Sequence, residues 1–324
     1  MKAIVYHEYG SADVLKCEEV AKPVPKDNEV LIKVRTASVN PLDWRLMEGN
    51  PRFLRLISGL SKPRDGRPGV DVAGEVEAVG KNVTKFKPGD KVFGSCSGAF
   101  AEYACTGESK IVMKPPNITF EQAASVNVAG LTALQGLRDK GKIQPGSRVL
   151  INGASGGVGI FAVQIAKTFG AHVTGVCSTK NVDLVRSIGA DEVIDYTQQD
   201  FTTSNQRYDV ILDCVGNHSF SESRRVLNPD GRHVGVGAPH DLSITDLLAS
   251  MTKDLWLSVS GSQKAVMFIA KASQADLALI GEFIAAGKLK PVIERRYSLS
   301  EAAEAVRHVE EGHARGKVIV TSEQ

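Results

Sequence analysis

Hydrophobic and polar positions divide the chain into two parts with different patterns. Before Thr119, short apolar stretches alternate with turn-forming residues, which is typical of β-strands. We expect strands at 2–6, 29–38, 71–79 and 91–93, the last of them after the turn at 87–90. Because few helical patterns lie between them, this part is predicted to be a β-rich barrel or sandwich.

From Thr119 onward, apolar residues recur at helical spacing between continuous apolar runs. Helices are expected at 120–125, 130–138, 157–169, 181–188 and 219–227, and strands at 148–153, 171–176, 192–195, 208–215 and 232–236. This alternation predicts a doubly wound parallel sheet, and an α/β protein as a whole.

The rest of the chain contains a further helix, the apolar run 255–259, helical segments at 275–286 and 300–311, and a last strand at 317–321. A nucleotide-binding unit is already complete without this tail, so we expect the tail to return to the first domain. The predicted domains are therefore 1–121 with 272–324, and 122–271.

A glycine cluster lies where the strand at 148–153 meets the following helix. Glycines at 153 and 156 allow a tight turn and a close approach of the backbone to phosphates, and a glycine at 159 lets the helix pack on the strand. The amides of the first helical turn would then face a dinucleotide pyrophosphate. The alternative is a structural turn without a ligand, but the flanking βαβ pattern favours a nucleotide site. Its expected residues are Gly153, Ala154, Ser155, Gly156, Gly157, Val158 and Gly159.

The next strand, at 171–176, ends in Cys177-Ser-Thr-Lys180. An acidic residue at this place would bind the ribose 2′-hydroxyl of NAD. No carboxylate is present in this stretch, whereas Ser178, Thr179 and Lys180 can bind a 2′-phosphate through charge-assisted hydrogen bonds. The pattern favours NADPH over NADH. The alternative is that the two hydroxyls cap the next helix and Lys180 is solvated.

Composition narrows the class of protein. With 324 residues the chain is long enough for two domains, and 42% hydrophobic and 23% charged residues are ordinary for a soluble globular protein. A net charge of +2 gives no reason to expect nucleic acid or a charged membrane surface as partner. The first residues show no signal core or basic amphipathic leader, and no apolar run reaches transmembrane length, so a soluble cytoplasmic protein is expected. The five scattered cysteines suit reduced thiols.

Further motifs occur along the chain in a specific order and spacing. They are 70–80 (VDVAGEVEAVG), 86–93 (FKPGDKVF), 98–103 (GAFAEY), 129–133 (AGLTA), the glycine cluster, 189–196 (GADEVIDY), 208–216 (YDVILDCVG) and 316–320 (GKVIV). In these motifs the chain resembles the medium-chain dehydrogenase/reductase superfamily, in its zinc-independent quinone oxidoreductase branch. The resemblance implies a GroES-like β-rich catalytic domain, a Rossmann domain and a homodimer. The oligomeric state is not readable from the residues themselves, although the apolar run 255–259 could pair across subunits.

Zinc-dependent members of that superfamily bind a catalytic metal through a cysteine and a histidine. Asn40 and Val70 stand at the matching positions here, and neither replaces a thiolate or an imidazole as a zinc ligand. The four closely spaced cysteines of the structural zinc site are also missing. The resemblance therefore implies a reaction without metal.

Without a metal, the substrate must already be electrophilic, as a quinone or an α,β-unsaturated carbonyl is. NADPH would deliver hydride, and the protein would orient the reactants and stabilise the developing oxyanion. The resemblance implies that Asn40 and Thr132 lie by the nicotinamide and the substrate as catalytic residues. Alternatively, Asn40 begins an Asx-turn before Pro41, and Thr132 bonds within its own helix. Asp71 is expected to be structural.

The resemblance also implies contacts with the cofactor outside the glycine cluster. Tyr196 and Lys180 match positions that contact the 2′-phosphate, although Tyr196 would alternatively pack in the core. Lys317 matches a position at the active-site rim, although a lysine that starts an edge strand is more often solvated. Backbone contacts are expected at strand ends, from Val215, Gly216, Gly235, Val236 and Gly237.

Several functional questions stay open at this level. The basic segment 40–68, with exposed apolar residues such as Phe53 and Leu56, is either a lid over the substrate or a loop packed on the barrel. The proton donor is unassigned, and water would suffice. Two other functions compete with quinone or enone reduction: reduction of enoyl thioesters, and NADPH binding without turnover, as in the crystallins of this branch. Basic residues that suit a phosphorylated acyl carrier are Arg52, Arg55, Lys62, Arg64 and Arg67.

Overall fold

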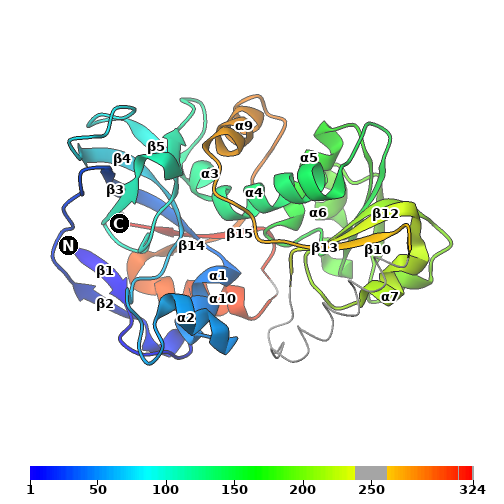
Figure 1. Cartoon of the computed structure of the whole chain (residues 1–324), viewed down its shortest axis with the longest axis horizontal. Coiled ribbons are helices and arrows are strands. Elements are labelled where there is room, and N and C mark those ends of the chain that lie inside the picture. Colours follow the sequence, from blue (N-terminus) through cyan, green and yellow to red (C-terminus); the bar gives the residue numbers. More distant parts are fainter. Residues whose placement is uncertain (238–260, 313, 323–324) are drawn as a thin grey trace. The chain divides into compact units, whose positions relative to one another are not determined.

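The computed structural model describes residues 1–237, 261–312 and 314–322. The chain forms two compact units, Met1–Leu131 with Ala272–Gln324, and Thr132–Lys271. Figure 1 shows the tail of the chain, from α9 (Gln274–Ala285) onward, within the first unit. The expected division between residues 121 and 122 falls inside α3 (Phe120–Ala124), whereas the units divide within α4 (Asn127–Gln135).

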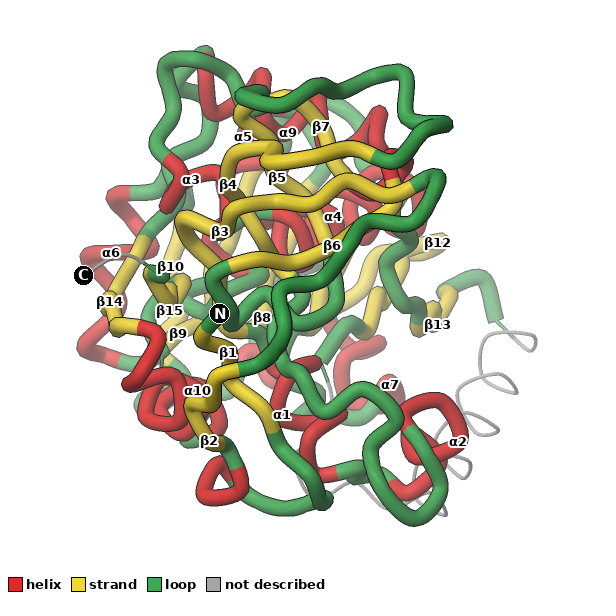
Figure 2. Tube along the Cα trace, turned by 90° about the vertical axis from the view of Figure 1, so that its left-hand side faces the viewer, coloured by secondary structure: helices red, strands yellow, loops and turns green. Residues whose placement is uncertain are grey.

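The first unit is built on a seven-stranded sheet in the order β14-β15-β3-β4-β5-β7, with β6 also paired to β3. Figure 2 shows β3, β4 and β5 side by side, in agreement with their antiparallel pairing. A separate two-stranded sheet pairs β1 with β2. The strands are β1 (Lys2–Val5), β2 (Lys16–Glu19), β3 (Glu29–Val39), β4 (Asp71–Val79), β5 (Lys91–Ser95), β6 (Tyr103–Gly107), β7 (Ile111–Met113), β14 (Ile293–Ser298) and β15 (Lys317–Thr321).

The last strand, β15, lies between β14 and β3 and is an interior strand. It runs antiparallel to β3, with Val318 opposite Val39. Its apolar side chains join a core that includes Ile32, Val72 and Val92. The view of Lys317 as a solvated lysine on an edge strand is therefore wrong, because its strand has a neighbour on both sides.

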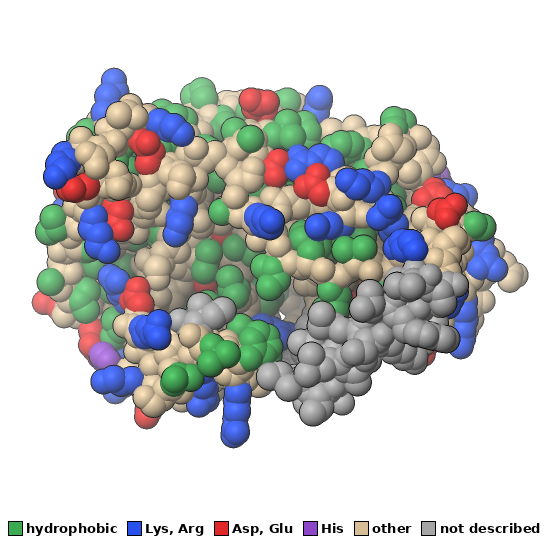
Figure 3. Space-filling view, in the orientation of Figure 1, with side chains coloured by type: hydrophobic (Ala, Val, Ile, Leu, Met, Phe, Trp, Pro, Cys, Tyr) green, Lys and Arg blue, Asp and Glu red, His purple; other side chains and the backbone are tan. Residues whose placement is uncertain are grey.

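Segment 40–68 contains two helices, α1 (Pro41–Glu48) and α2 (Arg55–Ser58). Proline suits the first position of α1 because it needs no amide hydrogen there, and Gly49 ends the helix with a φ of +60°. Leu56 and Leu60 are about two-thirds exposed. Figure 3 shows exposed hydrophobic side chains in the region of α2. That this segment closes over a substrate stays a prediction.

The second unit holds a six-stranded sheet in the order β10-β9-β8-β11-β12-β13, and every neighbouring pair is parallel. This order is the doubly wound arrangement of dinucleotide-binding sheets, with the reversal between β8 and β11. The doubly wound prediction is confirmed. The strands are β8 (Arg148–Asn152), β9 (His172–Cys177), β10 (Glu192–Asp195), β11 (Tyr208–Asp213), β12 (Leu227–Gly235) and β13 (Lys264–Met267).

Among its described residues, this unit contains the helices α5 (Gly159–Thr168), α6 (Val182–Ser187) and α7 (Phe220–Ser223), besides the end of α4. Every residue of α5 up to Ala166 is buried, so the helix is covered on all sides and not only on the side that packs against β8 and β9. One helix is expected at 130–138. The structure instead has α4, which begins at Asn127 and ends at Gln135, followed by a π-helical turn, Gly136–Gly141. The apolar run 255–259 and the helix before it lie outside the described residues.

Candidate functional site

The glycine cluster forms the turn between β8 and α5, as its pattern predicts. Gly153 has a φ of +82°, a left-handed conformation that other residues rarely adopt. A Cβ on Gly159 would lie 2.1 Å from the carbonyl oxygen of Gly153, so only glycine lets α5 start this close to the strand. Ala154, at the place of the second glycine in the commoner fingerprint, is completely buried.

Backbone amides of this turn fall into two groups. Those of Gly153 and Ala154 donate to the carbonyl of Val176, at 3.2 and 2.9 Å, and tie the turn to β9. Those of Ser155, Gly157 and Val158 have no hydrogen-bond acceptor within the part of the chain that the structure describes. Free amides at the start of a ten-residue helix suit an anion such as a pyrophosphate, and its binding here stays a prediction.

Asp213 organises the neighbouring strand ends. Its Oδ1 accepts from the amides of Val215 (3.0 Å) and Gly216 (2.9 Å) and from Nδ2 of Asn152 (2.9 Å). Its backbone carbonyl accepts from the amides of residues 236 and 237. Burial raises the pKa of Asp213, but the neighbouring His233 and the turn amides outweigh it and hold that pKa below its usual value.

These bonds bring the expected backbone contacts into one cluster beside the glycine turn. The cluster consists of Val215, Gly216, Gly235, Val236 and Gly237. Since Asp213 already occupies four of the five amides, a cofactor would meet this cluster mainly through carbonyl oxygens and Cα atoms. That contact stays a prediction.

At the end of β9, the hydroxyl of Ser178 does not cap the helical turn that follows it. Ser178 precedes a short 3-10 turn, Thr179–Asn181, but its side chain makes no capping hydrogen bond; its Oγ accepts from Nδ2 of Asn181 at 3.2 Å. Asn181 Nδ2 also reaches Oγ of Ser155 in the glycine turn, at 3.1 Å. Lys180 is exposed, and Tyr196 is 59% exposed, so core packing does not account for Tyr196.

A carboxylate stands at this strand end after all. Asp195, the last residue of β10, lies opposite Cys177 of β9, and its Oδ2 accepts from Thr179 Oγ1 at 2.6 Å. That hydrogen bond, with others from Thr197 and Gln198, holds the pKa of Asp195 below its usual value, so the group is ionised at neutral pH. The stretch 177–180 itself holds no carboxylate, but the neighbouring strand β10 brings one to the same strand end.

In the first unit, Asp71 is the centre of a buried polar cluster. It has no exposed surface, and its Oδ2 accepts from Ser38 Oγ (2.8 Å) and Asn40 Nδ2 (2.9 Å). Its Oδ1 accepts from Asn127 Nδ2 (3.0 Å) and the amide of Val128 (3.1 Å), at the start of α4. Asp71 thereby joins β3, β4 and the helix that carries Thr132, which is half-buried.

The side-chain amide of Asn40 is held at both ends. Lys317 Nζ donates to its Oδ1 at 2.6 Å, while its Nδ2 donates to Asp71 and to the carbonyl of Ser38 at 3.3 Å. Asn40 and Lys317 are each only 2% exposed. Burial lowers the pKa of the Lys317 ammonium, and Asp71, 3.7 Å away, together with Asp43 opposes this effect. Both Nδ2 hydrogens of Asn40 are therefore engaged within the unit.

Asp43 is a member of this cluster that sequence reasoning did not identify as functional. Its Oδ2 accepts from the backbone amide of Asn40 at 2.7 Å, and its buried Oδ1 has no partner among the described residues. Burial raises the pKa of Asp43 to about 7. With Asp43 protonated, the charges of Asp71 and Lys317 balance. The sequence signal for Asp43 is its position three residues after Asn40, in the first turn of a helix that begins at Pro41.

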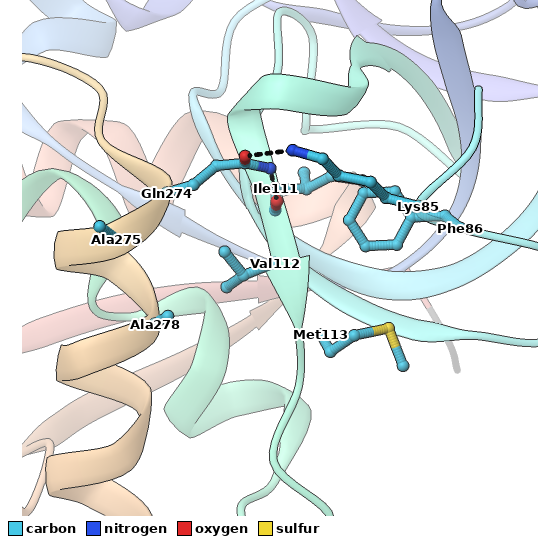
Figure 4. Close-up of a pocket in the computed structure, with 8 residues that line it drawn as sticks. All are labelled: Lys85, Phe86, Ile111, Val112, Met113, Gln274, Ala275 and Ala278. Carbon is cyan, nitrogen blue, oxygen red and sulfur yellow. Dashed lines mark hydrogen bonds between the residues drawn. The ribbon is translucent and has the colours of Figure 1, made fainter. Parts of the chain in front are cut away.

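A surface hollow elsewhere in the first unit contains none of the expected site residues. It lies between β7 and the start of α9. Figure 4 shows the side-chain amide of Gln274 directed at Lys85 and at the backbone of Ile111. Gln274 accepts from Lys85 Nζ at 3.0 Å and donates to the carbonyls of Glu108 and Ile111. These polar groups satisfy one another, so the hollow is a structural junction.

Two other kinds of feature are absent from the residues that the structure describes. Within 1–237, 261–312 and 314–322, no group of three or more His, Cys, Asp or Glu side chains is placed to hold a metal ion. No helix in those ranges has both the length and the apolar character required to span a bilayer.

Two family models match parts of the chain. The alcohol dehydrogenase GroES-like domain matches residues 26–117, and the family described as zinc-binding dehydrogenase matches residues 188–320. These ranges agree with the β-rich unit and with the last strands of the parallel sheet together with the tail.

Similar proteins cover the whole chain. Chloroplastic quinone-oxidoreductase QR1 of Triphysaria versicolor is 36% identical in a match that covers 99% of this chain and 98% of the relative. The structure of the quinone oxidoreductase from Coxiella burnetii matches with a TM-score of 0.87 and 32% identity, over 100% of this chain and 99% of that one. Escherichia coli quinone oxidoreductase, solved in complex with NADPH, matches with a TM-score of 0.82 and 25% identity, over 99% and 100%. The chain therefore belongs to the quinone oxidoreductase branch of the medium-chain dehydrogenase/reductase superfamily.

Proposed function

We propose that this oxidoreductase transfers hydride from NADPH to quinones or α,β-unsaturated carbonyls without a metal ion. The observation that carries the proposal is the glycine turn at the switch point of a doubly wound sheet, with unpaired amides at the start of α5. The quinone part rests on the names of relatives that cover nearly the whole chain.

The residues that would hold NADPH follow from the hydrogen bonds that remain unused. The amides of Ser155, Gly157 and Val158 suit the pyrophosphate. The hydroxyl of Ser178 accepts from Asn181 and so keeps its own proton for a 2′-phosphate, with the ammonium of Lys180 and the phenol of Tyr196 beside it in the proposed site. Bound in this way, the cofactor supplies the hydride.

We propose that Asn40 and Thr132 act at the reacting end of the cofactor. Since both hydrogens of the Asn40 amide are already bonded, its Oδ1 retains one lone pair, which suits an amide donor such as the nicotinamide carboxamide. The hydroxyl of Thr132 suits donation to the oxyanion that develops on the substrate. Water supplies the final proton in this proposal.

The chemistry of the Asn40 position supports a reaction without zinc. The amide oxygen of Asn40 lies 2.6 Å from the ammonium of Lys317, and a buried positive charge at that distance opposes a divalent cation. Val70, at the other matching position, has no donor atom. Overnight treatment with a zinc chelator is expected to leave the reductase activity unchanged.

The deciding experiment measures NADPH oxidation with a panel of quinones, enones and enoyl thioesters. We expect turnover of quinones or enones, and the same assay tests the two competing functions. Preferred turnover of enoyl thioesters would replace the proposed substrate class. Tight NADPH binding without oxidation by any compound would instead identify a nucleotide-binding protein that lacks catalysis.

A further inference from the structure

Asp195 lies at the edge of the sheet where the adenosine ribose is proposed to bind. It ends β10, next to the end of β9 that carries Ser178, Thr179 and Lys180. Its carboxylate accepts from Thr179 Oγ1 (2.6 Å), Thr197 Oγ1 (2.8 Å), the amide of Thr197 (3.0 Å) and Gln198 Nε2 (3.1 Å). Four donors from two sides hold this carboxylate in one orientation.

Because of Asp195, the two hydroxyls at the end of β9 offer a ligand different groups. Thr179 Oγ1 donates to Asp195 at 2.6 Å and also lies 3.0 Å from Thr197 Oγ1, so a ligand meets its lone pairs, which repel phosphate oxygens but accept from a ribose hydroxyl. Ser178 accepts from Asn181 and can still donate, which suits a phosphate. The pair Thr179–Asp195 therefore fits the free 2′-hydroxyl of NADH, while Ser178 and Lys180 fit the 2′-phosphate of NADPH.

Two opposite charges, those of Lys180 and Asp195, lie at this end of the two strands. Lys180 is exposed and has no carboxylate within salt-bridge distance among the residues that the structure describes, so its charge is available to a phosphate. The ionised Asp195 carries the opposite charge beside Thr179. A 2′-phosphate placed here would gain attraction from Lys180 and lose part of it to Asp195.

We propose that Asp195 is a specificity-determining residue that weakens the preference for NADPH, so that the enzyme also uses NADH. The proposal rests on the proposed nucleotide site. It adds that the cofactor preference is set by residues of two strands, with Ser178 and Lys180 favouring the phosphate and the pair Thr179–Asp195 opposing it.

The test is direct binding of NADPH and of NADH, measured by cofactor fluorescence, to the wild-type protein and to Asp195→Asn. Asparagine keeps the shape of the side chain and an oxygen for Thr179, but removes the charge. We expect the NADPH affinity to rise by roughly fivefold, the size of one exposed charge beside a phosphate, and the NADH affinity to stay the same or fall. The gain should shrink in high salt, because the charge is solvent-exposed.

Asp230→Asn is the matched control. Asp230 is exposed and lies near the start of β12. Because the strands of this sheet are parallel, it lies at the end of the sheet opposite to the strand ends that carry Asp195 and Ser178. Its φ of +63° suits asparagine, and the substitution changes the net charge by the same amount. The ratio of NADPH to NADH affinity should not change in this variant.

Lys180→Ala separates failure of this proposal from failure of the nucleotide site. If Lys180→Ala weakens NADPH binding while Asp195→Asn leaves the ratio at the wild-type value, the role of Asp195 is refuted and the cofactor site stands. If the wild-type protein binds neither cofactor, the proposed function and this inference fall together. A ratio that rises in Asp195→Asn and not in Asp230→Asn supports the proposal.

Discussion

Asp71 in the first unit and Asp195 in the second each stand at the end of a strand and accept four hydrogen bonds from other groups. Asp71 has no exposed surface, and a buried ammonium, that of Lys317, lies 3.7 Å away. Asp195 is partly exposed, and its partners are neutral hydroxyl and amide groups. The same side chain therefore serves as an internal junction in one unit and lies at an exposed strand end, where we propose a role in cofactor choice, in the other.

The difference lies in what replaces the carboxylate when it is removed. Water can reach the partners of Asp195, whereas the partners of Asp71 would remain buried without an acceptor. Removing one member of a buried ion pair strongly destabilises a protein, because the remaining charge is left without compensation. Variants of the two clusters should thus separate into effects on stability and effects on binding.

Asp71→Ala should have the largest effect. The substitution removes the acceptor that Ser38, Asn40 and Asn127 share and the negative charge 3.7 Å from Lys317, and we expect the free energy of unfolding to fall by about 3–5 kcal/mol. Denaturant unfolding measures this change. A loss below about 1 kcal/mol would show that the cluster is open to water and would remove the basis of the comparison.

Asp43→Asn tests the charge balance of the buried cluster through pH. The folded pKa of about 7 lies above the unfolded value, so the folded state holds a proton that the unfolded state releases. This contribution is fully present below about pH 4 and is lost as pH rises to about 7, by at most about 1.4 kcal/mol per pH unit. Asparagine cannot titrate.

The stability difference between wild type and Asp43→Asn should therefore decrease steadily from pH 5 to pH 7, as measured by denaturant unfolding at each pH. A difference that stays constant over this range would mean that Asp43 is ionised in the folded protein. The cluster would then hold two carboxylates against the single charge of Lys317.

Lys180→Ala should weaken NADPH binding by about tenfold and leave NADH binding unchanged, because the lost partner is the ammonium of a charge-assisted hydrogen bond to the 2′-phosphate. Titration of both cofactors measures it, with NADH as the internal control. The melting temperature should stay at the wild-type value, since Lys180 is exposed. An equal loss of affinity for both cofactors would contradict the assignment of the phosphate to this strand end.

Asp195→Ala should have the smallest effect on stability, with no measurable change in the free energy of unfolding, because its partners can bond to water. Its matched partner experiment is Asp71→Ala under the same conditions. If the two aspartates destabilise the protein equally when removed, exposure does not separate their roles.

Much of the fold could be predicted from the sequence, because apolar pattern and turn residues agree over long stretches. Strand β4 and strand β15 begin and end where the pattern predicts them, and the parallel sheet follows from the alternation. Strand β14 was missed, since its sequence IERRYS is polar and only partly buried. Such strands form because a neighbour offers backbone hydrogen bonds, which no local pattern records.

The candidate site was predicted less completely, for a related reason. The glycine turn is local and was readable, including the contact at Gly159. The role of Asp195 depends on β10 lying beside β9, and the burial of Lys317 depends on β15 entering the sheet between β14 and β3. A lysine that begins a strand is usually solvated, so only the tertiary pairing reveals the bond to Asn40.

The interior place of β15 has a consequence for how the protein is made. The second unit ends at Lys271, so its sheet can form while the rest of the chain is still being synthesised. The first unit has to wait for residues 317–321, because without them β14 has no connection to β3. Until Lys317 leaves the ribosome, Asp71 and Asn40 lack their cationic partner. Residues 1–131 of the nascent chain are thus left without β15, a strand that pairs with β3, until synthesis is nearly complete.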